Sequence, residues 1–323
     1  MEKLIIVGLG GAGYTAGLYA GRYGLNPLII GEMDGGTITE CHAVENFSGY
    51  PGSPAGYDIM MNMRKQAESF GSRIVSDRVV DIKLIKEGDP QGGYEVITSY
   101  SGTFQTKTLI LAVGTHKNKL NIPGEKEYFG KGVSYCATCD GFFMRGKKAA
   151  VVGGGNTAFI EAIYLSDICE KVYLIHRRKE FRGEKVWYDR IISKPNVELI
   201  LPSIPLEIGG ENKVQYIDIS KGTDAGEYKD CKVTTKERVQ VDGVFFAVGT
   251  IPNSVPGIDE ILHKNSNGYI NVDAHMKTNL HGVYAAGDCT TGSGGFRQLI
   301  TACAEGAIAA ESVFQFISKT ASC

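Results

Sequence analysis

The amino-acid sequence predicts an α/β fold of two domains, one inserted into the other, each containing a glycine-rich strand–turn–helix unit. Two observations carry this prediction. The glycine pattern occurs twice, near residues 8 and 153, and two similar strands that end in Ala-Val-Gly-Thr bracket the second copy. A length of 323 residues allows about two domains. Glycine is also abundant, since 42 of 323 residues is about 13% against a background of roughly 7%.

Composition excludes several other classes. With 43% hydrophobic and 22% charged residues the chain is typical of a globular protein, and a net charge of −2 predicts no contact with nucleic acid or an anionic membrane. Glycines interrupt the apolar stretch Leu4–Gly21 and no basic region precedes it, so we expect no signal peptide. No window reaches 18 consecutive apolar residues, so a membrane-spanning helix is not expected either. The eight cysteines are mostly isolated, which predicts reduced thiols and a cytoplasmic protein.

The first glycine unit begins with the strand-like residues 3–7, continues through a Gly-x-Gly-x-x-Gly turn, and leads into a helix at Tyr14–Tyr23 and a strand at Pro27–Ile30. Such a turn lets the backbone approach a pyrophosphate at the helix N-terminus. Glu32 follows Gly13 by 19 residues, where an acid binds ribose hydroxyls. We predict a dinucleotide site suited to FAD rather than a plain glycine-rich turn. Its residues are Gly8, Gly10, Gly11, Ala12, Gly13 and Glu32.

The second unit repeats the design with a strand at Ala149–Val152, a glycine turn, a helix at Ala158–Leu165 and a strand at Lys171–Ile175. Arginines now stand where the first unit has its acid, and arginine binds a 2′-phosphate through planar, charge-assisted hydrogen bonds. A solvated basic run is the alternative, but the position favours NADPH. The predicted residues are Gly153, Gly155, Asn156, Thr157, Ala158, His176, Arg177, Arg178 and Arg182.

A third feature is the strand-like run His281–Asp288, followed by a glycine-rich turn at Gly292–Gly295 and a helix from Arg297 towards Phe316. An acid at a strand end beside a helix N-terminus suits a ribityl hydroxyl and a phosphate. On sequence alone, a strand–turn–helix connection without a ligand explains the run equally well.

The two strands Leu109–Thr115 and Val244–Thr250 indicate where the chain crosses between domains. We predict a discontinuous FAD-binding domain of residues 1–115 and 249–323, and an inserted NADPH-binding domain of residues 116–248. Both are expected to be Rossmann-like domains of the three-layer ββα type.

The segment Cys136-Ala137-Thr138-Cys139 is the only C-x-x-C in the chain. Two cysteines at this spacing form a redox disulfide, and the adjacent Asp140 suits a proton donor or acceptor. Half of a zinc site is the competing interpretation, but no second C-x-x-C or histidine pair supplies the other two ligands. Inert buried thiols are the third possibility, and no metal is expected.

Together these motifs resemble the low-molecular-weight thioredoxin reductases, flavoproteins of the pyridine nucleotide-disulfide oxidoreductase class. The similarity is collinear over nearly the whole chain and includes Val44-Glu45-Asn46, the segment 136–143, His176-Arg177-Arg178 and Gly287-Asp288. The resemblance implies further FAD contacts from residues outside the first glycine turn, namely Gly35, Gly36, Thr37, Asn46, Gly114, Gly287, Asp288, Arg297 and Gln298.

The resemblance also implies a mechanism. NADPH passes a hydride to FAD, the flavin reduces the Cys136–Cys139 disulfide, and Cys136 attacks the disulfide of thioredoxin while Asp140 handles the proton. Cys139 is then the flavin-proximal thiol. The family rotates the NADPH-binding domain between the two steps, so hinges are expected near Gly114-Thr115 and Val248-Gly249-Thr250. A homodimer is a further expectation.

Partner docking would use Phe142, Phe143 and Arg145, although buried packing accounts for the two phenylalanines equally well. Two features depart from the family. Thr37-Ile38 stands where Gln-Leu usually follows the glycine pair, and Cys41-His42 and the loop Tyr50–Tyr57 differ from the usual pattern. The open alternatives are a related reductase with another electron donor or acceptor, and a non-catalytic redox sensor with a metal-bound C-x-x-C.

Overall fold

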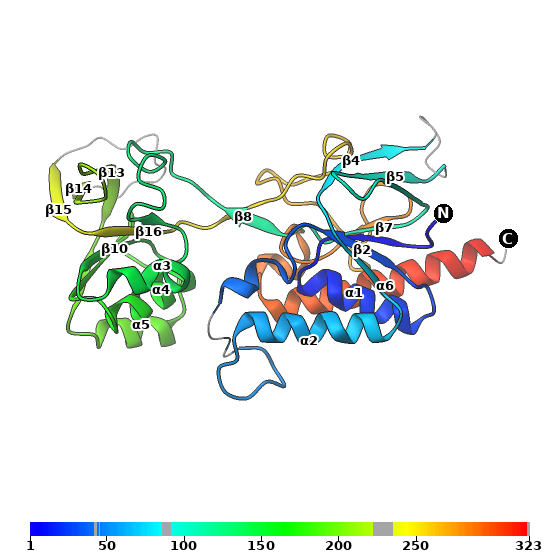
Figure 1. Cartoon of the computed structure of the whole chain (residues 1–323), viewed down its shortest axis with the longest axis horizontal. Coiled ribbons are helices and arrows are strands. Elements are labelled where there is room, and N and C mark those ends of the chain that lie inside the picture. The colour runs from blue at the N-terminus through cyan, green and yellow to red at the C-terminus, as the bar shows by residue number, and fades with distance from the viewer. Residues whose placement is uncertain (42–43, 45, 86–91, 222–234, 322–323) are drawn as a thin grey trace. The chain divides into compact units, whose positions relative to one another are not determined.

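The structure is a computed structural model that describes residues 1–41, 44, 46–85, 92–221 and 235–321, and only the backbone of residues 138, 139 and 321. The chain divides into two compact units (Figure 1). Unit 1 comprises Met1–His116 and Ile251–Cys323, and unit 2 comprises Lys117–Thr250. These bounds lie within two residues of those expected from the Ala-Val-Gly-Thr strands.

Unit 1 has three layers. The middle layer is a parallel sheet, in the order β18 (Val283–Ala285), β7 (Leu109–Leu111), β1 (Ile5–Val7), β2 (Leu28–Gly31) and β3 (Arg73–Ser76). One face carries the helices α1 (Gly11–Arg22), α2 (Gly56–Ser69) and α6 (Leu299–Ala321). The other face carries the antiparallel strands β4 (Val79–Leu84), β5 (Tyr94–Thr98) and β6 (Thr103–Thr106), as Figure 1 shows.

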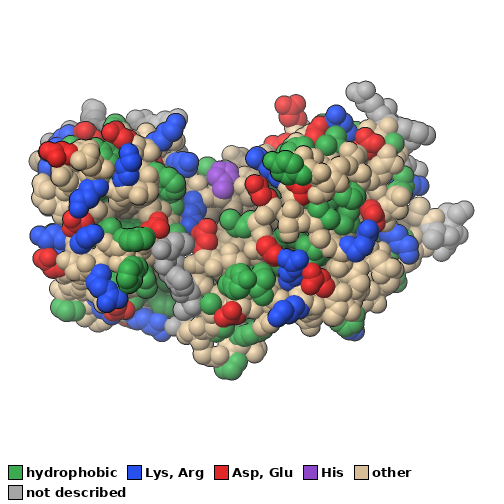
Figure 2. Space-filling model, in the orientation of Figure 1, with side chains coloured by type: hydrophobic (Ala, Val, Ile, Leu, Met, Phe, Trp, Pro, Cys, Tyr) green, Lys and Arg blue, Asp and Glu red, His purple; other side chains and the backbone are tan. Residues whose placement is uncertain are grey.

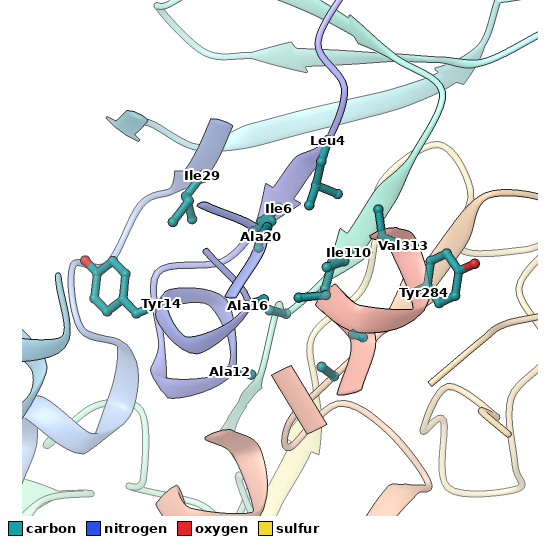
Figure 3. Packing of buried hydrophobic residues seen from close by; sticks show 14 of the residues in the cluster. Leu4, Ile6, Ala12, Tyr14, Ala16, Ala20, Ile29, Ile110, Tyr284 and Val313 are labelled. Atoms are coloured by element: carbon teal, nitrogen blue, oxygen red, sulfur yellow. The ribbon is translucent and has the colours of Figure 1, made fainter. Parts of the chain in front are cut away.

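Alternating side chains of the parallel strands fill two separate cores, because successive residues of a strand point to opposite faces. Ile6, Ile29 and Ile110 pack against the helices (Figure 3). Their neighbours Ile5 and Leu109 belong to the core under the antiparallel strands. Both faces of the sheet are therefore buried, as the continuous apolar strand sequences predict.

Small residues let α1 and α6 cross closely. Ala12, Ala16 and Ala20 recur every four residues on α1 and are buried in the helix-side core (Figure 3). A Cβ atom on Gly306 of α6 would lie 2.2 Å from the carbonyl oxygen of Ala12. By length and composition α6 could cross a membrane. In this structure 33% of the apolar 18-residue window of α6 is buried.

Unit 2 repeats the three layers. Its parallel sheet has the order β12 (Val197–Ile200), β11 (Lys171–Ile175), β10 (Lys148–Gly153), β16 (Gly243–Ala247) and β9 (Val133–Ser134). The helical face carries α3 (Ala137–Asp140), α4 (Asn156–Ser166) and α5 (Lys185–Ile192). The antiparallel strands are β13 (Ser203–Gly209), β14 (Tyr216–Lys221) and β15 (Lys236–Gln240). The predicted α/β fold class is confirmed.

The two Ala-Val-Gly-Thr segments occupy equivalent positions in the two sheets. The strand β7 pairs with β1, and β16 pairs with β10, each beside the strand that leads into a glycine turn. After these strands the chain turns at Gly114 and Gly249, with φ of 65° and 96°. It continues in β8 (Thr115–Lys117) and β17 (Thr250–Pro252), which form a two-stranded sheet.

Charged side chains of both signs are interspersed over the visible surface, as the near balance of 34 basic and 36 acidic residues predicts (Figure 2).

Candidate functional site

The first glycine turn leaves an open N-terminus on α1. Gly10 is the N-cap in an extended conformation and has no side chain that could cap the helix. Nothing lies within 4 Å of where its Cβ would be. Gly13 is closed, since its Cβ would lie 1.9 Å from the carbonyl oxygen of Gly8. The first-turn N–H groups of α1 therefore face a space that a phosphate can enter, while Gly13 allows close packing of the turn.

A second loop lies over this turn. Gly35 donates its N–H to the Leu9 carbonyl (2.9 Å), and a Cβ on Gly36 would lie 3.2 Å from Cα of Gly10. The Asp34 carboxylate accepts hydrogen bonds from Tyr14 on α1 and Arg64 on α2. The sequence prediction missed this anchor. Its signal is an acid immediately before the glycine pair.

The third feature is organised by a residue that the sequence prediction also missed, Glu305 on α6. Its buried carboxylate accepts hydrogen bonds from the Gly287 N–H (2.8 Å), the Thr290 hydroxyl (2.9 Å) and the Ser293 hydroxyl (2.7 Å). Burial, together with the nearby Glu305 charge, raises the pKa of Asp288, which Arg297 partly offsets. Glu305 is the only charged residue in the run 299–310, and that isolation is its sequence signal.

Segments far apart in the chain meet near this turn. The Asn46 side chain donates to Oε1 of Gln298 (2.8 Å), which joins two predicted FAD residues 252 positions apart. Arg297 donates to the Asp288 carbonyl (3.1 Å), and its guanidinium lies 3.7 Å from the centroid of the Tyr269 ring. A Cβ on Gly287 would lie 2.9 Å from Cβ of Ala12, so unit 1 brings together the first glycine turn, Asp288 and the start of α6.

Other predicted FAD residues lie more openly. Glu32 is exposed after β2, with Oε2 3.9 Å from Nε of Arg78. Thr37 is exposed in the short 3₁₀ helix η1 (Gly36–Glu40). Of the departures from the family pattern, Cys41 is exposed, whereas His42, like Glu45, lies outside the described residues. Residues 46–51 line an open hollow.

The second glycine turn has the same geometry. Gly155 is the extended N-cap of α4, without a side-chain cap bond, and has open space where a Cβ would be. A Cβ on Gly153 would lie 2.3 Å from the Ala247 carbonyl oxygen. Asn156 donates to Glu184 (2.6 Å) and accepts from the N–H of the same residue (2.7 Å), which fixes the following loop against the turn.

His176 and the arginines differ in burial: His176 is buried, Arg177 and Arg178 are half-buried, and Arg182 is exposed. The His176 ring is buried, stacks on Phe181 with 5.1 Å between centroids, and lies 2.2 Å from where a Cβ on Gly154 would be. Burial and the three nearby arginines lower the pKa of His176 against the opposing effect of the Glu180 carbonyl. The charge of Arg182, then burial, then Arg177 lower the pKa of Arg178, so the three guanidinium groups form one basic cluster. We call Arg177, Arg178 and Arg182 the arginine cluster.

The redox segment connects β9 with α3. Cys136 is disulfide-bonded, and its N–H donates to the Ser134 hydroxyl (3.0 Å). The same hydroxyl donates to Asp140 Oδ2 (2.6 Å), which orients that carboxylate next to the segment. The Ala137 N–H donates to Glu161 on α4 (3.5 Å). Of Cys139 the structure describes the backbone only.

Among the described residues, four free cysteines remain: Cys41, Cys169, Cys289 and Cys303. Burial raises the pKa of Cys169 to about 11 and of Cys289 to about 12, and it also raises the pKa of Cys303. These three thiols are poor nucleophiles because the thiolate is the reactive form. Within the same described residues, no group of three or more histidine, cysteine or acidic side chains could hold a metal ion.

These features define a class of protein with two dinucleotide-binding domains. In one domain an acid follows the strand after the glycine turn, and in the other arginines do. The second domain also carries a disulfide-bonded cysteine. A family model described as pyridine nucleotide-disulphide oxidoreductase matches residues 2–306. The chain belongs to this family.

Individual relatives agree with this assignment. The chain is 38% identical over 320 residues to a thioredoxin reductase of Rickettsia bellii, with 98% of each chain covered. It is 36% identical over 315 residues to a thioredoxin reductase of Treponema pallidum, covering 97% of this chain and 96% of the relative. The crystal structure of Lactococcus lactis thioredoxin reductase superposes with a TM-score of 0.89 at 32% identity, covering 99% of this chain and 100% of the other.

Proposed function

We propose that this chain is an NADPH-dependent flavoprotein that reduces the disulfide of thioredoxin or a thioredoxin-like protein. The observation that carries the proposal is the position of Cys136: it is disulfide-bonded in the unit that also carries the arginine-ended glycine turn. Full-length similarity to thioredoxin reductases supports the same activity. The net reaction converts NADPH, a proton and the partner disulfide into NADP⁺ and the partner dithiol.

FAD would bind in unit 1. The open N-terminus of α1 at Gly10 suits its pyrophosphate, and Glu32 at the end of β2 suits ribose hydroxyls. The Glu305-anchored turn would present Asp288 to the ribityl chain. The proposed contact residues are Gly8, Gly10, Gly11, Ala12, Gly13, Glu32, Gly35, Gly36, Thr37, Asn46, Gly114, Gly287, Asp288, Arg297 and Gln298.

NADPH would bind in unit 2, at the open N-terminus of α4. The arginine cluster would hold its 2′-phosphate, and the buried His176 would fix the start of the loop that carries the cluster. Gly153, Gly155, Asn156, Thr157 and Ala158 form the turn. When bound, the two cofactors together supply two electrons to the cysteine pair.

The protein residues perform the thiol chemistry. The Cys136 thiolate attacks one sulfur of the partner disulfide, the partner S–S bond breaks, and its other sulfur leaves as a thiolate. Cys139 then attacks Cys136, which releases the second partner thiol and restores the Cys136–Cys139 disulfide. Asp140, oriented by Ser134, accepts and returns protons during these exchanges.

Phe142 and Phe143 would form the docking surface for the partner. Their side chains are 64% and 66% exposed, so burial in the core does not explain them. The Arg145 guanidinium lies 5.4 Å from the centroid of the Phe142 ring. Exposed aromatic rings beside an arginine are typical of binding hot spots. Reorientation of unit 2 would use Gly114 and Gly249, and a cytoplasmic homodimer is the proposed working form.

Flavin reduction tests the cofactor assignment. Purified protein should be yellow, and its absorbance near 450 nm should bleach rapidly with NADPH but slowly with NADH. Cys136→Ser should bleach normally yet fail to reduce thioredoxin, while the exposed-cysteine control Cys41→Ser should behave as wild type. Thioredoxin reduction by Cys136→Ser at the wild-type rate would overturn the proposed relay.

The alternatives give different results. Equal bleaching with NADPH and NADH would point to another electron donor. A colourless protein with stoichiometric zinc by elemental analysis would replace the reductase with a metal-binding sensor.

A further inference from the structure

Lys117, on β8, contacts the redox segment directly. Its ammonium group donates a hydrogen bond to the backbone carbonyl of Tyr135 (2.6 Å), the residue before Cys136. Both residues belong to unit 2, and Lys117 is partly buried. A buried or half-buried ammonium bonded to a peptide carbonyl is a fixed positive charge rather than a freely moving surface lysine.

The peptide between Tyr135 and Cys136 is held at both ends. Lys117 donates to the carbonyl oxygen of this peptide, which belongs to Tyr135. The N–H of the same peptide, which belongs to Cys136, donates to the Ser134 hydroxyl (3.0 Å). The Tyr135 side chain is fixed as well, because its hydroxyl donates to Oε1 of Glu125 (2.6 Å). Glu125 is buried and accepts the N–H groups of Leu120 and Ile122. These bonds tie the Cys136 backbone to the chain that follows β8.

Three acidic groups of the described residues lie close to the segment. Asp140 on α3 is bonded to Ser134, Glu161 on α4 accepts from the Ala137 N–H, and Glu125 lies behind Tyr135. Negative charges near a thiol disfavour its thiolate, and a nearby positive charge favours it. Lys117 therefore brings a positive charge to the peptide that joins Tyr135 to the reacting cysteine.

We infer that Lys117 is a positioning residue of the redox centre, whose charge favours the ionised form of the Cys136 thiol and whose hydrogen bond fixes the peptide before it. This inference rests on the proposed function, in which the Cys136 thiolate attacks the partner disulfide. It adds a residue outside the C-x-x-C segment that sets how readily that attack occurs.

The test measures Cys136 itself and needs no partner protein. Holoenzyme reduced with dithiothreitol and freed of it is pulsed with iodoacetamide between pH 5.5 and 9.5, and tandem mass spectrometry quantifies alkylation at Cys136. For Lys117→Met we expect alkylation roughly threefold slower at pH 7 and an apparent pKa for Cys136 about 0.5 higher, the effect of one nearby charge at an intermediate dielectric constant.

Lys119→Met is the matched control, because Lys119 has the same charge two residues along the chain and is exposed. It should match the wild type, and Lys117→Arg should retain most of the wild-type rate. Lys117→Gln keeps a hydrogen-bond donor without the charge, so it should be as slow as Lys117→Met. Flavin absorbance and near-ultraviolet circular dichroism report whether each variant is folded.

Superimposable pH profiles for Lys117→Met and Lys119→Met would overturn the inference. If Lys117→Met does not fold, equal alkylation rates in Lys117→Gln and Lys117→Arg would overturn it instead. Failure of the wild type to reduce thioredoxin would contradict the proposed function while leaving the alkylation comparison intact, so the two failures are distinguishable.

Discussion

The two glycine turns share a backbone but differ in charge. Gly10 and Gly155 are both extended N-caps with open space beside them, at the start of α1 and α4. The next strand ends in the exposed Glu32 in unit 1 and in the arginine cluster in unit 2. In the proposed function the turn therefore provides the phosphate site in both units, and the residues after the next strand select which dinucleotide binds there.

The turns also differ in how tightly they close. The third small position is Gly13 in unit 1, where a Cβ would lie 1.9 Å from the Gly8 carbonyl oxygen. In unit 2 it is Ala158, whose buried methyl group lies 2.9 Å from where a Cβ on Gly153 would be. A Gly→Ala substitution, which adds one methyl group, can therefore show which glycine of a turn has open space beside it and which is closely packed.

The largest expected effect comes from Gly13→Ala. The added methyl group collides with backbone that cannot move away, so we expect a loss of about 3 kcal/mol in the free energy of unfolding. Urea denaturation measures this. Gly10→Ala is the matched control: its methyl group enters open space, so the protein should fold normally but release FAD more easily. Equal stability of the two variants would contradict the close packing at Gly13.

The next effect tests the arginine cluster. Arg177→Ala/Arg178→Ala removes charge-assisted hydrogen bonds to the 2′-phosphate, so KM for NADPH should rise roughly a hundredfold while KM for NADH stays nearly constant. Steady-state kinetics with each nucleotide measure it. Arg190→Ala, in which an arginine stacked on Trp187 is removed from the same unit, should change neither value. A parallel rise for NADPH and NADH would remove the assigned specificity.

Glu305 offers a smaller test on the unit 1 side. In Glu305→Gln an amide nitrogen replaces one carboxylate oxygen, so the Ser293 hydroxyl must accept rather than donate, and the bonds from Gly287 and Thr290 are made to a neutral oxygen instead of a carboxylate. We expect FAD affinity to fall about tenfold, the effect of one hydrogen bond to a charged group. Fluorescence of released flavin measures this. Glu311→Gln on the same helix, where the carboxylate accepts from the nearby Gln315, should retain FAD as the wild type does.

The smallest effect is a pH dependence. Because burial and the arginine cluster lower the pKa of His176 in the folded state, the unfolded chain binds a proton more readily between the lowered pKa and about 6.5. Stability should therefore fall as the pH decreases through this window. His176→Phe keeps a stacking ring but cannot titrate, so its Tm should change less between pH 7 and 5 than that of the wild type. His263→Phe, at an exposed site, is the control, and identical slopes for wild type and His176→Phe would contradict the assignment.

Short sequence patterns predicted most of the fold. The glycine turns, the parallel strands beside them and the equivalent positions of the two Ala-Val-Gly-Thr segments follow from local backbone geometry, which a few adjacent residues determine. The structure begins α1 at Gly11 rather than at Tyr14, because the glycines at the N-terminus form its first turn. The sequence also distinguishes the two turns by the charge that follows them, because the acid and the arginines are recognised by their distance along the chain from the glycines.

Residues that are neighbours along the chain therefore encode most of the predicted chemistry: two glycine turns that suit phosphate, the opposite charges that follow them, and the C-x-x-C segment. The distant side chains that hold those features in place became known from the folded chain, such as Glu305 bonded to the Asp288 turn, Asp34 between Tyr14 and Arg64, and Lys117 at the Tyr135 carbonyl. The folded chain also shows that His176 is buried while Phe142 and Phe143 are exposed. The physical reason is that a hydrogen bond or a buried contact joins two segments, and their meeting depends on the packing of the whole unit.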